Sequence, residues 1–109
     1  MTFTEQKVLF ADQIAEMEKV LTSKGSDYTK GEDSLEVFKK IGHLADLSPL
    51  DVCKMFVCAK VVRINSLLHT GNEPNHDSIR DSFLDLQCYS ILWEQIYIDL
   101  KYEKRNSNG

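Results

Sequence analysis

The chain has 109 residues and a formal net charge of −4, from 13 basic and 17 acidic residues. This length fits a single domain. The acidic balance disfavours a general nucleic-acid binder or a protein of anionic membrane surfaces, because both need a basic face. No apolar run approaches the roughly 20 residues that span a bilayer, and the N-terminus lacks the basic and apolar regions of a signal peptide. We therefore expect a small domain with no nucleic-acid and no membrane partner.

The chain contains three cysteines, Cys53, Cys58 and Cys88. An odd number is not typical of the disulfide framework of a small secreted protein. The spacing of Cys53 and Cys58, with the histidines scattered elsewhere, does not give the paired ligands of a zinc site. We expect free thiols that act as small apolar side chains in the cytoplasm.

The spacing of apolar residues predicts an all-α chain with four helices. The first helix is expected to begin with a capping box between Thr2 and Glu5. It should end at about Ser23 or Lys24, because Gly25 suits a left-handed C-cap, and the polar residues 24–31 should form a loop. The apolar stripe of this helix is Phe10, Ile14, Met17 and Leu21.

The second and third helices follow in quick succession. Ser48 and Pro49 are expected to start the third helix as its N-cap and first residue, and this helix should run to about His69. Residues 70–75 then break the pattern. The expected apolar faces are Leu35, Phe38, Ile41, Gly42 and Ala45 in the second helix, and Cys53, Val57, Val61, Ile64 and Leu68 in the third.

The last helix is predicted to run from about His76 to Tyr102. Its expected core stripe is Ile79, Phe83, Leu86, Ser90, Trp93, Tyr97 and Leu100, and its far side is also apolar through Leu84, Cys88, Ile91, Leu92 and Ile96. A helix that is apolar all round is buried on all sides. We therefore expect a four-helix bundle-like domain over residues 1–103, with a long, centrally buried C-terminal helix that also self-associates. Residues 104–109 should be a disordered tail.

Three aspartates, Asp77, Asp81 and Asp85, recur at every fourth position of the last helix. Carboxylates in such a row can hold Mg²⁺ through substrate phosphates. They are more typical of a solvated acidic face near a helix N-terminus, where the dipole favours Asp.

Two cations, Lys60 and Arg63, lie within the least polar helix. Burying an unpaired charge is expensive, so these side chains need anionic partners. The partner is either internal, Asp81 or Asp85, or a bound phosphate, for which Arg offers a bidentate fork.

A further candidate is the loop with Asp27 and Tyr28. The Tyr ring can stack on a base and backbone N–H groups can meet phosphate, or the ring folds back onto the core. No Gly-rich phosphate loop, Ser/His/Asp order or His-Glu-x-x-His motif occurs. The sequence therefore favours a non-enzymatic function.

Five short motifs follow one another along the chain: Lys24-Gly25-x-Asp27-Tyr28, Asp33-x-Leu35-x-x-Phe38, Ser48-Pro49, Lys60-x-x-Arg63 and Asp77-Ser78-x-x-Asp81-x-x-x-Asp85-Leu86-x-x-Tyr89. In this order they resemble a family of small all-helical proteins common in bacteriophages, catalogued as a nucleotide-modification-associated domain of unknown function. The resemblance covers about residues 15–100. The chain departs from the family at Asp77, where Glu is expected, and at Gln87-Cys88, where a small residue and Asn are expected.

A second, architectural resemblance is to the all-helical nucleoside-triphosphate pyrophosphohydrolases of the MazG and dimeric dUTPase type, which use Mg²⁺. Their Glu-x-x-Glu followed by Glu-x-x-Asp is absent from this chain. Fold analogy alone does not establish a reaction.

The leading hypothesis is a phage-type protein that binds and sequesters a nucleotide or nucleotide-derived signal, without turnover, in the cytoplasm of an infected bacterium as a counter to host defence. No cofactor is required for this role. A Mg²⁺-dependent phosphohydrolase with metal on Asp77, Asp81 and Asp85 is the first alternative, and a protein–protein adaptor is the second. The expected ligand-binding residues are Lys24, Asp27, Tyr28, Lys60, Arg63, Asp81, Asp85 and Tyr89.

Overall fold

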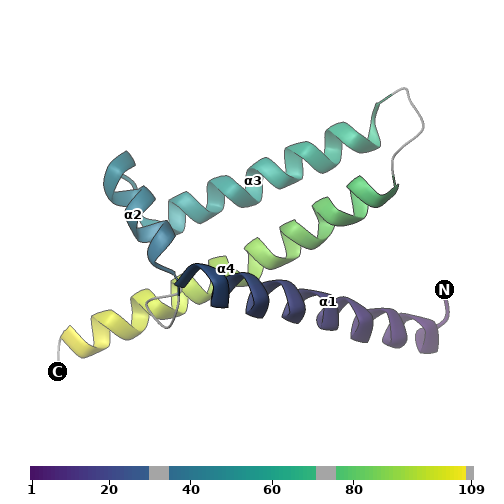
Figure 1. The fold of residues 1–109 in the computed structure, drawn as a ribbon, viewed down its shortest axis with the longest axis horizontal. Helices are drawn as coiled ribbons and strands as arrows, with labels where there is room; N and C mark the ends of the chain where they lie inside the picture. The colour runs from purple at the N-terminus through teal and green to yellow at the C-terminus, as the bar shows by residue number, and fades with distance from the viewer. Residues whose placement is uncertain (30–34, 71–75, 108–109) are drawn as a thin grey trace. The chain divides into compact units, whose positions relative to one another are not determined.

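The computed structural model describes residues 1–29, 35–70 and 76–107, with side chains described for residues 1–23, 35–70 and 76–102. These ranges contain four α-helices and no strand (Figure 1). The prediction of an all-α chain is therefore confirmed. The helices are α1 (Phe3–Thr29), α2 (Glu36–Ala45), α3 (Pro49–Leu68) and α4 (His76–Ser107).

The chain divides into two compact units, Met1–Ser34 and Leu35–Gly109. The first unit contains α1, and the second contains α2, α3 and α4. The prediction of one domain over residues 1–103 stays a prediction. Helix α4 includes residues 104–107, which were expected to belong to the tail.

Helix α1 begins with the predicted capping box. The Glu5 N–H donates to Thr2 Oγ1 at 3.1 Å, and the Thr2 N–H donates to Glu5 Oε2 at 3.0 Å. The predicted end at Ser23 or Lys24 is wrong, because the helix continues through Gly25 to Thr29. A glycine inside a helix costs about 1 kcal/mol relative to alanine and does not end the helix by itself.

Helix α2 ends in a tight turn around Gly42. Asp46 adopts the left-handed conformation (φ 60°), and the Leu47 N–H donates to the Gly42 carbonyl at 2.8 Å. A Cβ atom at Gly42 would lie 2.5 Å from the Leu47 carbonyl oxygen. The absence of a side chain at Gly42 thus lets the chain turn directly from α2 into α3.

Helix α3 begins and ends where the sequence predicted. Ser48 is the N-cap, and its Oγ accepts the Asp51 N–H at 3.1 Å, while Pro49 occupies the first helical position. At the other end the His69 N–H donates to the carbonyls of Asn65 and Ser66. The short polar signals on either side of α3 are therefore sufficient to place it.

Helices α3 and α4 run antiparallel side by side, and α2 packs against the beginning of α3 (Figure 1). The core of this unit draws on all three helices. Phe56 packs against this core, where its ring meets Phe38 edge-on at 5.9 Å and stacks on Tyr89 at 5.5 Å. The buried cluster is Leu35, Phe38, Val52, Cys53 and Ile96.

The predicted core stripe of α4 is confirmed only in part, because Ile79 is buried and Trp93 and Leu100 pack against the core. Phe83, Ser90 and Tyr97 are exposed, whereas Ile96 and Cys88, expected on the far side, are buried. The packed face is therefore rotated from the predicted one. The ion pairs Lys39–Asp99 and Lys60–Asp85 connect α4 to α2 and α3.

Candidate functional site

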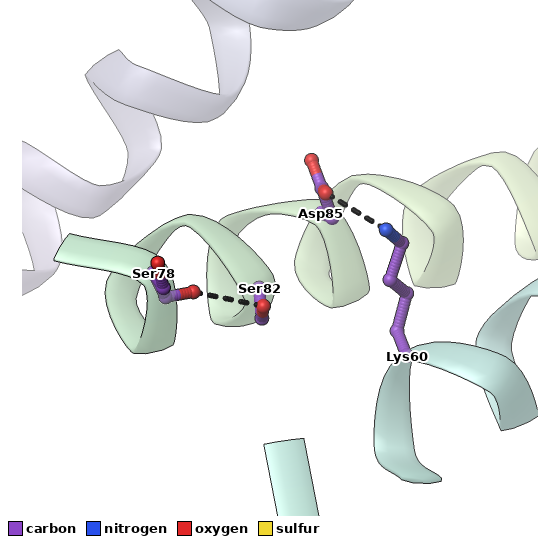
Figure 2. A network of polar contacts seen from close by, with 4 residues as sticks. All are labelled: Lys60, Ser78, Ser82 and Asp85. Atoms are coloured by element: carbon purple, nitrogen blue, oxygen red, sulfur yellow. Dashed lines mark hydrogen bonds and ion pairs between the residues drawn. The ribbon is translucent and has the colours of Figure 1, made fainter. Parts of the chain in front are cut away.

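Lys60 and Asp85 form an ion pair across α3 and α4, with Lys60 Nζ 3.0 Å from Asp85 Oδ2. Figure 2 shows the Lys60 side chain reaching from α3 to the carboxylate on α4. Both side chains are partly exposed, at 27% and 38%. Of the two interpretations of Lys60, the internal ion pair is the one that forms, and Asp85 is the partner.

A small polar layer continues from this pair along α4. Ser82 is almost fully buried, and its Oγ donates to the Ser78 carbonyl oxygen one turn earlier at 2.8 Å (Figure 2). The hydroxyl is thus satisfied within its own helix.

The other charged candidates lie on the surface. Arg63, Asp77 and Asp81 are exposed. Among the described residues there is no group of three His, Cys, Asp or Glu side chains that can hold a metal ion. The metal site on Asp77, Asp81 and Asp85 stays a prediction from sequence.

Tyr89 and Cys53 belong to the core. The Tyr89 ring stacks on Phe56, and the Cys53 thiol donates to the Tyr89 carbonyl at 3.5 Å. Burial raises the pKa of Cys53 from 9.0 to about 11, so this thiol stays protonated at neutral pH. Among the three cysteines, which are all free, Cys53 and Cys88 are buried as expected and Cys58 is exposed.

The remaining ligand candidates, Lys24, Asp27 and Tyr28, lie in the last part of α1. The backbone there is helical, so the prediction of a polar loop is wrong for residues 24–29. Their side chains are outside the described part of the chain, as are residues 30 and 31 of the predicted loop.

Sequence reasoning missed the outer face of α3, the side turned away from Cys53 and Ile64. We define this outer face by Met55, Cys58, Ala59 and Val62, which recur on one side of the helix and are all exposed. Met55 is 60% exposed and Val62 68%. From the sequence, two apolar sides were expected on the last helix. In the structure, α3 also has exposed apolar side chains opposite its buried side. The signal was present in the sequence as spacings of four and three residues.

Comparison with protein-family models, with curated proteins and with solved structures finds no match for this chain. In the described part of the chain, no helix is both long and apolar enough to cross a membrane.

Proposed function

We propose that this chain is a self-associating helical module, which pairs with a second copy through the outer face of α3. The observation that carries the proposal is the exposure of four uncharged side chains on that face. Soluble monomers rarely leave contiguous apolar patches uncovered, and larger ones mark interaction sites. A helix with two apolar sides is stabilised when both are covered.

The outer face suits pairing with a second copy because its residues are arranged nearly symmetrically about the centre of the face. From the central pair Cys58 and Ala59, the next residue on the face is Met55 toward the N-terminus and Val62 toward the C-terminus. An antiparallel copy therefore sets Met55 against Val62 at both ends. A two-fold interface requires this self-complementarity, and the small Ala59 at the crossing point lets the two helices approach closely.

Cys58 provides a direct test, because it is the exposed cysteine and lies at the centre of the face. A short bismaleimide should link two full-length chains through Cys58. The dimer product should disappear in Val62→Glu and in Cys58→Ser. It should persist in the control Leu44→Glu, which changes an exposed apolar residue of α2.

Two outcomes would contradict this proposal. One is the absence of cross-linked dimer at concentrations where the chain is folded by circular dichroism. The other is a dimer that resists Val62→Glu but is lost in Ile98→Glu. That result would instead support self-association through the C-terminal helix, where Ile98 is exposed. The adaptor hypothesis gains if the same face proves to bind an unrelated protein.

Nucleotide binding stays a prediction, and the geometry favours it less. Lys60 is already paired with Asp85, so a phosphate would have to displace that carboxylate. The Tyr89 ring is stacked on Phe56 and is not free to stack on a base in the same position. Isothermal titration with linear and cyclic nucleotides tests the idea, with and without Mg²⁺, on the wild type and on Arg63→Ala.

A further inference from the structure

Helix α1 carries a row of large side chains that its own unit does not cover. Phe3 is 71% exposed and Phe10 60%, and Ile14 is also exposed. The helix has 27 residues, which makes it about 40 Å long. Helices in water gain most of their stability from packing of an apolar face rather than from intrinsic propensity. Packing of another helix against this row of side chains would therefore stabilise α1.

The spacing of this row is that of a coiled coil. We define the seam of α1 as Phe3, Lys7, Phe10, Ile14, Met17 and Leu21, in which steps of four and three residues alternate. This alternation defines the a and d positions of a heptad repeat, which pack knobs into holes against another helix. Glu5, Asp12 and Lys19 lie on the opposite side of the helix. The flanking residues Gln6, Ala11 and Gln13 are uncharged, so they impose no repulsion on a neighbouring helix.

Lys7 is the one charged residue of the seam, and it determines the orientation. Its Nζ lies 5.2 Å from the centre of the Phe3 ring. In a parallel pair two Lys7 side chains would meet across the seam, and like charges there are unfavourable. In an antiparallel pair Lys7 lies level with Met17 of the second copy, next to Glu18. A single Lys at such a position specifies register and oligomer state at some cost in stability.

We infer that α1 pairs with α1 of a second copy of this chain as an antiparallel two-helix coiled coil. In this pairing Phe3 packs against Leu21 of the second copy, Lys7 against Met17, and Phe10 against Ile14. All six seam positions are then matched, and Lys7 gains an oppositely charged neighbour in Glu18. The seam is separate from the outer face of α3, so this inference does not rest on the proposed function.

Cysteine pairing tests the orientation. In a Cys58→Ser background, chains carrying Phe3→Cys are mixed with chains carrying Leu21→Cys and oxidised. Mixed disulfides should dominate. Phe3→Cys chains alone should not cross-link, because the two positions lie about 27 Å apart along an antiparallel pair, beyond the reach of a disulfide. A predominance of disulfides between two Phe3→Cys chains would overturn the orientation.

Matched substitutions test the seam itself. Phe10 and Val8 are both 60% exposed, but only Phe10 is in the seam, and Val8 lies on the other side of the helix. In a Val62→Glu background, sedimentation equilibrium should show a dimer whose dissociation constant rises more than about tenfold with Phe10→Glu. Val8→Glu should leave it unchanged. Equal effects of the two substitutions, or a monomer with intact helix content in that background, would refute the pairing of α1.

Discussion

At the scale of single residues, the ion pair between Lys60 and Asp85 links α3 to α4. Lys60 is embedded in the least polar helix, and Asp85 is the carboxylate that comes within 3.0 Å of it. We expect a double-mutant cycle with Lys60→Ala and Asp85→Ala to give a coupling free energy of about 0.2–1 kcal/mol, because the pair is partly exposed. Urea unfolding measures it, and the coupling should shrink in high salt. Additive effects of the two substitutions would contradict a stabilising pair.

The buried thiol of Cys53 makes stability depend on pH. Its pKa is 9.0 in the unfolded reference and about 11 in the fold. Above pH 9 the unfolded chain loses this proton first, so the free energy of unfolding falls as pH rises from 9 toward 11. The loss from this group is about 1.4 kcal/mol by pH 10. Urea unfolding at pH 8 and 10 should show this extra loss in the wild type relative to Cys53→Ala, whose other titrating groups are the same. Parallel pH profiles would contradict it.

At the scale of elements, the turn between α2 and α3 depends on Gly42. A Cβ there would lie 2.5 Å from the Leu47 carbonyl oxygen, a backbone atom that cannot move aside alone. We expect Gly42→Ala to lower the free energy of unfolding by roughly 1–3 kcal/mol, although alanine favours helices. Denaturant unfolding measures this effect, with His43→Ala as the control at an exposed neighbouring position. A neutral or stabilising Gly42→Ala would show that the turn can open without cost.

Helix ends with local polar signals could be predicted from the sequence, and so could the buried face of α2 with Phe38 and Gly42; the packed face of α4 could be predicted only in part. The cap at Ser48 and the box of Thr2 and Glu5 act within one turn, so neighbouring residues suffice to place them. Gly25 misled the prediction of the end of α1, because glycine weakens a helix without stopping it.

The packed face of α4 depends on distant partners. Ile96 packs in the buried cluster with Val52 and Cys53 of α3, and the spacing within α4 does not carry the identity of these partners. For the candidate site, the cost of burying a charge predicted an anionic partner for Lys60, but the choice among Asp81, Asp85 and a phosphate came from the structure. The outer face of α3 was missed because a single apolar side was expected for α3 from its sequence.

At the scale of the whole molecule, two self-complementary surfaces on one chain restrict how copies can assemble. In each of the two proposed pairings, a two-fold axis relates the copies. The seam of α1 pairs with the same seam of a second copy, and the outer face of α3 pairs with the same face of a second copy. When both surfaces are used within one pair of chains, the result is a closed dimer. When they engage different copies, the chains form longer assemblies. The two surfaces lie in different units, so each can be removed without altering residues of the other.

Combining Phe10→Glu with Val62→Glu should therefore produce a monomer, whereas each single variant should still form a dimer. Both side chains are exposed, so the charges enter water in the separated chain and oppose only association, because an interface would bury them unpaired. Light scattering after size-exclusion chromatography measures the masses, and Trp93 fluorescence with circular dichroism confirms that the fold is kept. If Phe10→Glu alone gives a monomer, the outer face of α3 does not hold two copies together. If Val62→Glu alone gives a monomer, the seam of α1 does not hold two copies together.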